Sequence, residues 1–87
     1  MKISIITPCY NAEKTIADTI HSVAAQTVPV FEHIIVDAVS TDKTRSIVDQ
    51  HKSSITRFIS EPDTGLYNAM NNGIRLATGD VIVILNF

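Results

Sequence analysis

Four short runs of β-branched and apolar residues, separated by segments with helical periodicity, constrain the fold of this chain more than any other feature. The runs span 3–7, 31–36, 55–60 and 80–86. Apolar residues recur at helical spacing within 12–26 and 66–77, and a polar cluster at 40–42 is suited to capping a helix near 42–52. Strands that alternate with helices favour a parallel sheet, because parallel strands need a crossover connection. The chain is therefore predicted to be an α/β protein of βαβαβαβ order.

We expect a Rossmann-like three-layer αβα arrangement with the spatial strand order 3-2-1-4. Asn11 is placed to cap the first helix, and Gly79 to cap the third at its C-terminal end. Within the fourth run, residues 81–85 are apolar on both alternations, which is typical of a strand buried on both faces. As an edge strand it would be prone to self-association, so a dimer through this strand or the third helix is expected.

Length and composition narrow the function classes. The 87 residues make one small domain, 1–87, and their net charge of -2 provides no basic surface for nucleic acid. The single Cys9 excludes an internal disulfide, and the three histidines show no metal-ligand spacing. The longest apolar run, 81–85, is far shorter than the ~20 residues of a membrane span, so a cytoplasmic protein is expected.

Polar residues follow three of the predicted strands. Ligands of open α/β sheets bind outside the carboxyl ends of the strands, where the segments 7–11, 37–42 and 60–65 would lie. All three glycines occur at position 65 or later, so no glycine-rich phosphate loop follows the first strand. An acid at such an end, as at Asp37, can accept hydrogen bonds from a nucleobase or ribose, and Tyr10 can cover a base. A structural role remains the alternative for each, since helix N-termini also attract Ser, Thr, Asp and Asn.

Taken in order, the motifs resemble family 2 glycosyltransferases. The resemblance is carried by IITPCYNA at 5–12, IVDAVSTDKT at 35–44, ISEPDTGLYNAMNNGI at 59–74, ATGDVI at 77–82 and the Leu-Asn pair at 85–86. It implies the GT-A fold, whose first half binds a nucleotide-diphosphate sugar. By this resemblance Thr7, Pro8 and Tyr10 line the base pocket, and Asp37 bonds the base or ribose. Asp63 and Gly65 border the nucleotide, and Asn71 and Asp80 support the sugar-nucleotide side.

The chain also departs from the family pattern. After Leu-Asn the family continues with a small residue and two aspartates that hold a divalent cation, Mg or Mn in a complete member, whereas here Phe87 follows Asn86. Ala38 replaces an acidic or glycine residue. We therefore expect a truncated glycosyltransferase that carries only the donor half, with no catalytic residue, no metal site and no turnover by itself. Whether it acts as an enzyme stays open at this point.

Two other functions compete with the donor-binding one. A non-catalytic dimeric module would keep the fold and bind little. A phospho-acceptor receiver domain also repeats βα units, but no acidic pair follows the first strand here. Calorimetry with uridine and guanosine diphosphates would separate donor binding from the dimeric module, because the module predicts no saturable heat.

Overall fold

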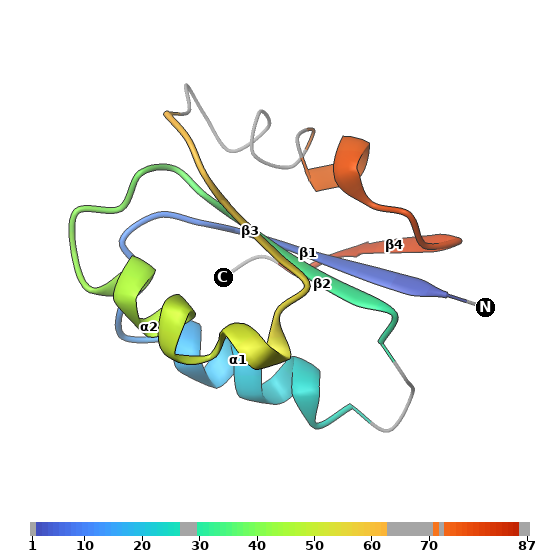
Figure 1. Ribbon diagram of the computed structural model, residues 1–87, viewed down its shortest axis with the longest axis horizontal. Helices are drawn as coiled ribbons and strands as arrows, with labels where there is room; N and C mark the ends of the chain where they lie inside the picture. The colour runs from blue at the N-terminus through green and yellow to red at the C-terminus, as the bar shows by residue number, and fades with distance from the viewer. Residues whose placement is uncertain (1, 27–29, 63–70, 72, 86–87) are drawn as a thin grey trace.

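The protein forms a parallel four-stranded sheet with the predicted spatial order, in which the strands numbered along the chain lie as 3-2-1-4. The computed structural model describes residues 2–26, 30–62, 71 and 73–85. The strands are β1 (Ile3–Cys9), β2 (Glu32–Asp37), β3 (Arg57–Ser60) and β4 (Val81–Ile84). The helices are α1 (Ile16–Ala24), α2 (Thr44–Gln50) and the short 3-10 helix η1 (Lys52–Ser54). Residues 73–76 are also helical (Figure 1).

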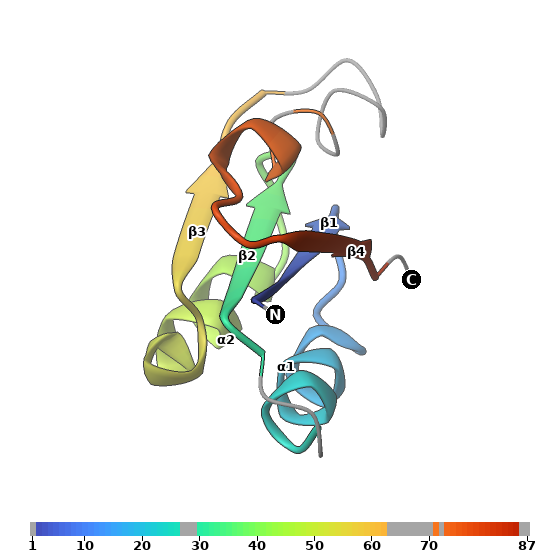
Figure 2. The same cartoon turned by 90° about the vertical axis from the view of Figure 1, so that its right-hand side faces the viewer.

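The sheet lies between two helical layers (Figures 1 and 2). Alternate residues of each strand face opposite sides, so β2 sends Ile35 toward α1 and α2, and Ile34 toward the 73–76 helix. Gly73 packs directly on β1, since a Cβ built there would lie 2.4 Å from Cγ2 of Ile6. The predicted three-layer arrangement is confirmed for the described residues.

β1 runs two residues further than predicted and passes through Pro8. Proline has no N–H, which would normally break a ladder inside a sheet. The carbonyl of Ile6 accepts a bond from Leu85 on the β4 side, and that of Cys9 accepts from Ala38 on the β2 side. Pro8 therefore faces the β4 side, beyond the last β4 residue paired with β1. The missing donor costs little there, and this is why the strand continues.

Both predicted caps differ from the structure. α1 begins at Ile16, not near residue 12, and Asn11 lies in the left-handed region with φ 48°. Gly79 does not take a positive φ, so it is no left-handed helix cap. Its need for glycine is instead steric, because a Cβ would lie 2.3 Å from Oγ of Ser4.

The fourth strand is at the edge, but it is not buried on both faces as predicted. Val81, Ile82 and Val83 are 37–41% exposed, and β4 pairs with β1 alone in the described part of the chain. The apolar composition of β4 therefore did not correctly predict how deeply its side chains are buried. No helix among the described residues is long and apolar enough to cross a bilayer.

Candidate functional site

Asp37, the last residue of β2, ties three strand ends together. Its carboxylate accepts bonds from the N–H of Ser40 at 2.9 Å, the hydroxyl of Ser60 at 2.9 Å and the thiol of Cys9 at 3.5 Å. The hydroxyl of Ser40 donates a further, short bond to it. The side chain is fully buried. These donors come from the ends of β1, β2 and β3, so the predicted convergence of the strand ends is present, with Asp37 as its internal anchor.

The segment after β1 is bound to the segment after β2 by side chains. The N–H groups of residues 11, 12 and 13 donate to Ser40 Oγ, Thr44 Oγ1 and Asp42 Oδ2, at 2.8, 2.8 and 3.2 Å. Asn11 Oδ1 accepts from the N–H of Thr41 at 2.9 Å. The cluster at 40–42, predicted to cap its own helix, therefore mainly holds the neighbouring turn, and these N–H groups are already paired.

Asp42 alone keeps part of the predicted capping role. Its Oδ1 accepts from the N–H of Thr44, the first residue of α2, at 2.9 Å and from the hydroxyl at 2.6 Å. Desolvation would raise the pKa of Asp42, but the bonds from Thr44 and from the N–H of Glu13 outweigh it and lower the pKa. Asp42 is therefore held as a carboxylate in the turn.

Two exposed side chains stand on these joined segments. Cys9 and Ala38 are linked by a backbone bond of 3.0 Å, and Asn11 and Ser40 by the bond just described. Tyr10, 60% exposed, and Val39, 38% exposed, are the residues between these two links. Val39 has φ 53°, a left-handed conformation that is a genuine outlier for a β-branched residue. The sequence analysis predicted Tyr10 as a site residue but not Val39, because no local sequence pattern indicates the left-handed conformation of Val39.

Thr7 and Pro8 precede this edge on β1 and are buried. Oγ1 of Thr7 is 2.8 Å from Nε2 of His33, and Nδ1 of His33 is buried without a partner. Burial lowers the pKa of His33 to about 4, which keeps the ring neutral. The side chain of Thr7 is thus paired with a buried histidine of β2. At Thr7 and Pro8, only the backbone is available to border a ligand.

Cys9 is a structural thiol. Burial, followed by the nearby charge of Asp37 and the bond to it, raises the pKa of Cys9 to about 12. A protonated thiol is a poor nucleophile, which argues against a catalytic role.

The other predicted site residues do not all meet at this edge. Asp63 and Gly65 lie outside the described residues. Asn71 is exposed on the helical stretch that packs on β1. Asp80 immediately precedes β4, and its carboxylate accepts from the N–H of Lys2 at 2.9 Å. It therefore lies at the amino end of the sheet, whereas Asp37 lies at the carboxyl end, roughly 20 Å away for strands of this length. The structure does not bring Asp80 to the predicted site.

A second buried network occupies the amino end and was not predicted. Glu32 accepts bonds from the hydroxyl of Ser4 at 2.6 Å and the N–H of Thr78 at 2.5 Å, and Ser4 accepts from the N–H of Gly79 at 2.9 Å. Desolvation opposes ionisation, but these bonds outweigh it and lower the pKa of Glu32. The network anchors the connection that enters β4, which is a structural role.

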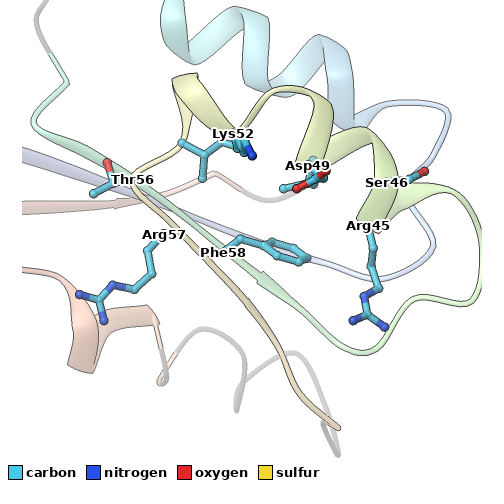
Figure 3. Close-up of a pocket in the computed structure, with 9 residues that line it drawn as sticks. Arg45, Ser46, Asp49, Lys52, Thr56, Arg57 and Phe58 are labelled. Carbon is cyan, nitrogen blue, oxygen red and sulfur yellow. The ribbon is translucent and has the colours of Figure 1, made fainter.

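An open groove of about 600 Å³ lies elsewhere, between α2 and β3 (Figure 3). Its lining includes Arg45, Asp49, Lys52, Arg57 and Phe58, and none of the residues of the strand-end loops. This groove is therefore separate from the strand-end site. Among the described residues no group of three or more His, Cys, Asp or Glu side chains could hold a metal ion, so these residues do not fit a divalent-cation site.

Two proteins named as glycosyltransferases are similar to this chain in sequence. The chain is 40% identical over 87 residues to TuaG of Bacillus subtilis, named for teichuronic acid biosynthesis, and covers 34% of its length. It is 33% identical to the poly(ribitol-phosphate) beta-N-acetylglucosaminyltransferase TarS of Staphylococcus aureus, and covers 16% of it. The alignments take in 97% and 99% of this chain. The chain thus spans about a third or less of these proteins.

Solved structures share the fold. TarS residues 1–349 in complex with UDP-GlcNAc match with a TM-score of 0.89 and 31% identity, over 99% of this chain and 26% of that one. The mannosyltransferase PcManGT of Pyrobaculum calidifontis, in complex with GDP-Man and Mn²⁺, matches with a TM-score of 0.87 and 28% identity, over 98% and 27%. The expected GT-A architecture is confirmed by these neighbours. The family described as Glycosyl transferase family 2 matches residues 4–86, and the chain belongs to this family.

Proposed function

We propose that the carboxyl ends of β1, β2 and β3 bind the nucleotide of a nucleotide-diphosphate sugar, as the donor half of a family 2 glycosyltransferase. The observation that carries this proposal is the exposed Tyr10 ring beside strand ends that Asp37 fixes in place. The family membership supports it, as do neighbours solved with UDP-GlcNAc and GDP-Man. The proposed reaction of the whole protein is sugar transfer to an acceptor glycan.

Within this site we assign different roles to the predicted residues. Tyr10 contacts the base, because its ring is exposed at the strand ends. Asp37 acts as a positioning residue, because its buried carboxylate is occupied by donors from the chain itself. Thr7 and Pro8 form the floor under Tyr10, and Asp63, Gly65 and Asn71 stay as predicted contacts of the nucleotide.

Calorimetric titration of the chain with UDP and GDP tests the proposal. Saturable heat with either nucleotide is expected, and Tyr10→Ala should weaken binding about tenfold or more, since base–aromatic stacking contributes ~1–3 kcal/mol. Phe31→Ala is the matched control, because Phe31 is 46% exposed and precedes β2 at the opposite end of the sheet. No saturable heat with any nucleoside diphosphate would overturn the proposal.

We further propose that transfer requires sequence beyond these 87 residues, since the relatives are about three times longer or more. Transfer of sugar by the purified chain alone would contradict this.

The exposed apolar residues of β4 favour a second candidate, a dimeric module that keeps the fold without the activity. Val81, Ile82 and Val83 would then be covered by a second copy at this edge. Sedimentation should show a dimer that Val83→Lys converts to monomer. A monomer at high concentration would argue against it.

A further inference from the structure

Val39 is held in its unusual conformation by hydrogen bonds to the two residues that follow it. Asp37 binds the N–H of Ser40 immediately after Val39, and Asn11 binds the N–H of Thr41 one residue further. A left-handed valine is unfavourable, and such outliers persist where the surroundings over-determine them, often at ligand sites. Here the surroundings include a carboxylate that is completely buried. The chain thus fixes an apolar side chain outward at a place where a glycine or asparagine would fit without strain.

Val39 and Tyr10 occupy equivalent positions on the two hydrogen-bonded segments that follow β2 and β1. The backbone bond from Ala38 to Cys9 lies on one side of the pair, and the bond from Asn11 to Ser40 lies on the other. The remaining large hydrophobic side chains exposed in the described residues lie before β2, on the 73–76 helix or on β4. Tyr10 and Val39 are therefore the two large apolar side chains that the described loops present at the carboxyl ends of the strands.

We propose that Val39 is a base-contacting residue, which with Tyr10 forms an apolar platform for the planar face of the donor nucleobase. This inference rests on the proposed nucleotide-binding function. A base is apolar on its faces and polar at its edges, so an aromatic ring and a branched aliphatic group suit the face. The Asp37 carboxylate is not assigned to the polar edge of the base, because donors from the chain itself already satisfy it.

The variant Val39→Asn tests this with two readouts, because nucleotide affinity is expected to fall while thermal stability is not. Asparagine tolerates the left-handed conformation, so thermal stability should stay equal or rise by about 4 °C or more as strain is relieved. Loss of the apolar contact should weaken binding of UDP or GDP about fivefold. Val39→Gly should weaken binding in the same direction. Val81→Asn is the matched control, since Val81 is 37% exposed but lies on β4, and its affinity should equal that of the unaltered chain.

The outcomes separate this inference from the function beneath it. If the unaltered chain gives no saturable heat, the proposed function fails. If the unaltered chain binds and both Val39 variants bind within twofold of it, the role of Val39 is wrong. It is also wrong if affinity and melting temperature fall together, because Val39 would then act through folding alone.

Discussion

The hydroxyl of Ser60, at the end of β3, donates a 2.9 Å hydrogen bond to the carboxylate of Asp37, at the end of β2. The two residues are register partners in neighbouring parallel strands. The bond closes a set of donors from three strand ends around one buried charge, and a charge of this kind is stable in the interior only when such donors satisfy it. The local architecture of the proposed nucleotide site therefore depends on a side chain that solvent does not reach.

Replacement of Asp37 by asparagine is expected to destabilise the fold. The amide turns one acceptor into a donor that faces other donors, and hydrogen bonds to a charged group contribute about 1.5–3 kcal/mol each. We expect the free energy of unfolding, measured in urea, to fall by about 2–4 kcal/mol. Asp49→Asn on the exposed side of α2 is the control and should change it by under about 0.5 kcal/mol. Equal effects of the two changes would show that the buried network contributes little.

The order of the strands and the layers followed from sequence because hydrophobic periodicity and crossover rules act over the whole chain. The details of the site did not, because they depend on contacts between distant segments. Asn11 was assigned to a helix that begins five residues later, whereas its side chain binds Thr41. Asp37 was expected to face a ligand, but its donors come from residues 3 to 28 positions away, which no local pattern displays.

Burial was also hard to predict at the edge of the sheet. All four residues of β4 are apolar and only three of the six in β2 are, yet β2 is the buried strand, because in the described part of the chain it has neighbours on both sides and β4 has one. Conversely, β2 begins with Glu32 and His33, which are buried because Ser4, Thr78 and Thr7 supply partners from elsewhere. The composition of a segment therefore predicts that a strand forms there better than it predicts which neighbours cover that strand.

Acid should destabilise the protein through His33. Its pKa is about 4 in the folded state against an ordinary 6.5, so protons bind the unfolded chain more tightly. The contribution of the neutral His33 to the free energy of unfolding is fully present above pH 6.5. It is lost as the pH falls toward 4, which lowers the free energy of unfolding by up to about 3 kcal/mol. Urea unfolding between pH 7 and 4 measures this, and His33→Gln should flatten the profile in that range. A signal assigned to the His33 imidazole that titrates near pH 6.5 in the folded protein would contradict the expectation.

Cys9 should resist alkylation while the protein is folded. With a pKa of about 12, only about one thiol in 10⁴ is ionised at pH 8, and the thiolate is the reactive form. Iodoacetamide should modify it slowly in native buffer and rapidly in urea, as followed by mass spectrometry. Asp37→Asn, which removes the neighbouring negative charge, should speed the native reaction. Rapid modification of the unaltered folded chain would show that the thiol is accessible and ionised.

Gly79→Ala should be among the most damaging small substitutions, because the backbone at this position touches β1. The added Cβ would lie 2.3 Å from Ser4 Oγ and 2.8 Å from the carbonyl oxygen of Lys2, and a carbonyl cannot rotate away as a side chain can. The change also disturbs the Gly79 N–H bond to Ser4 and, through Ser4, the bond to Glu32. We expect a loss of about 2–4 kcal/mol in the free energy of unfolding. Asp80→Ala next to it removes only an exposed bond to the N–H of Lys2, so its cost should be clearly smaller, and equal costs would contradict the steric argument.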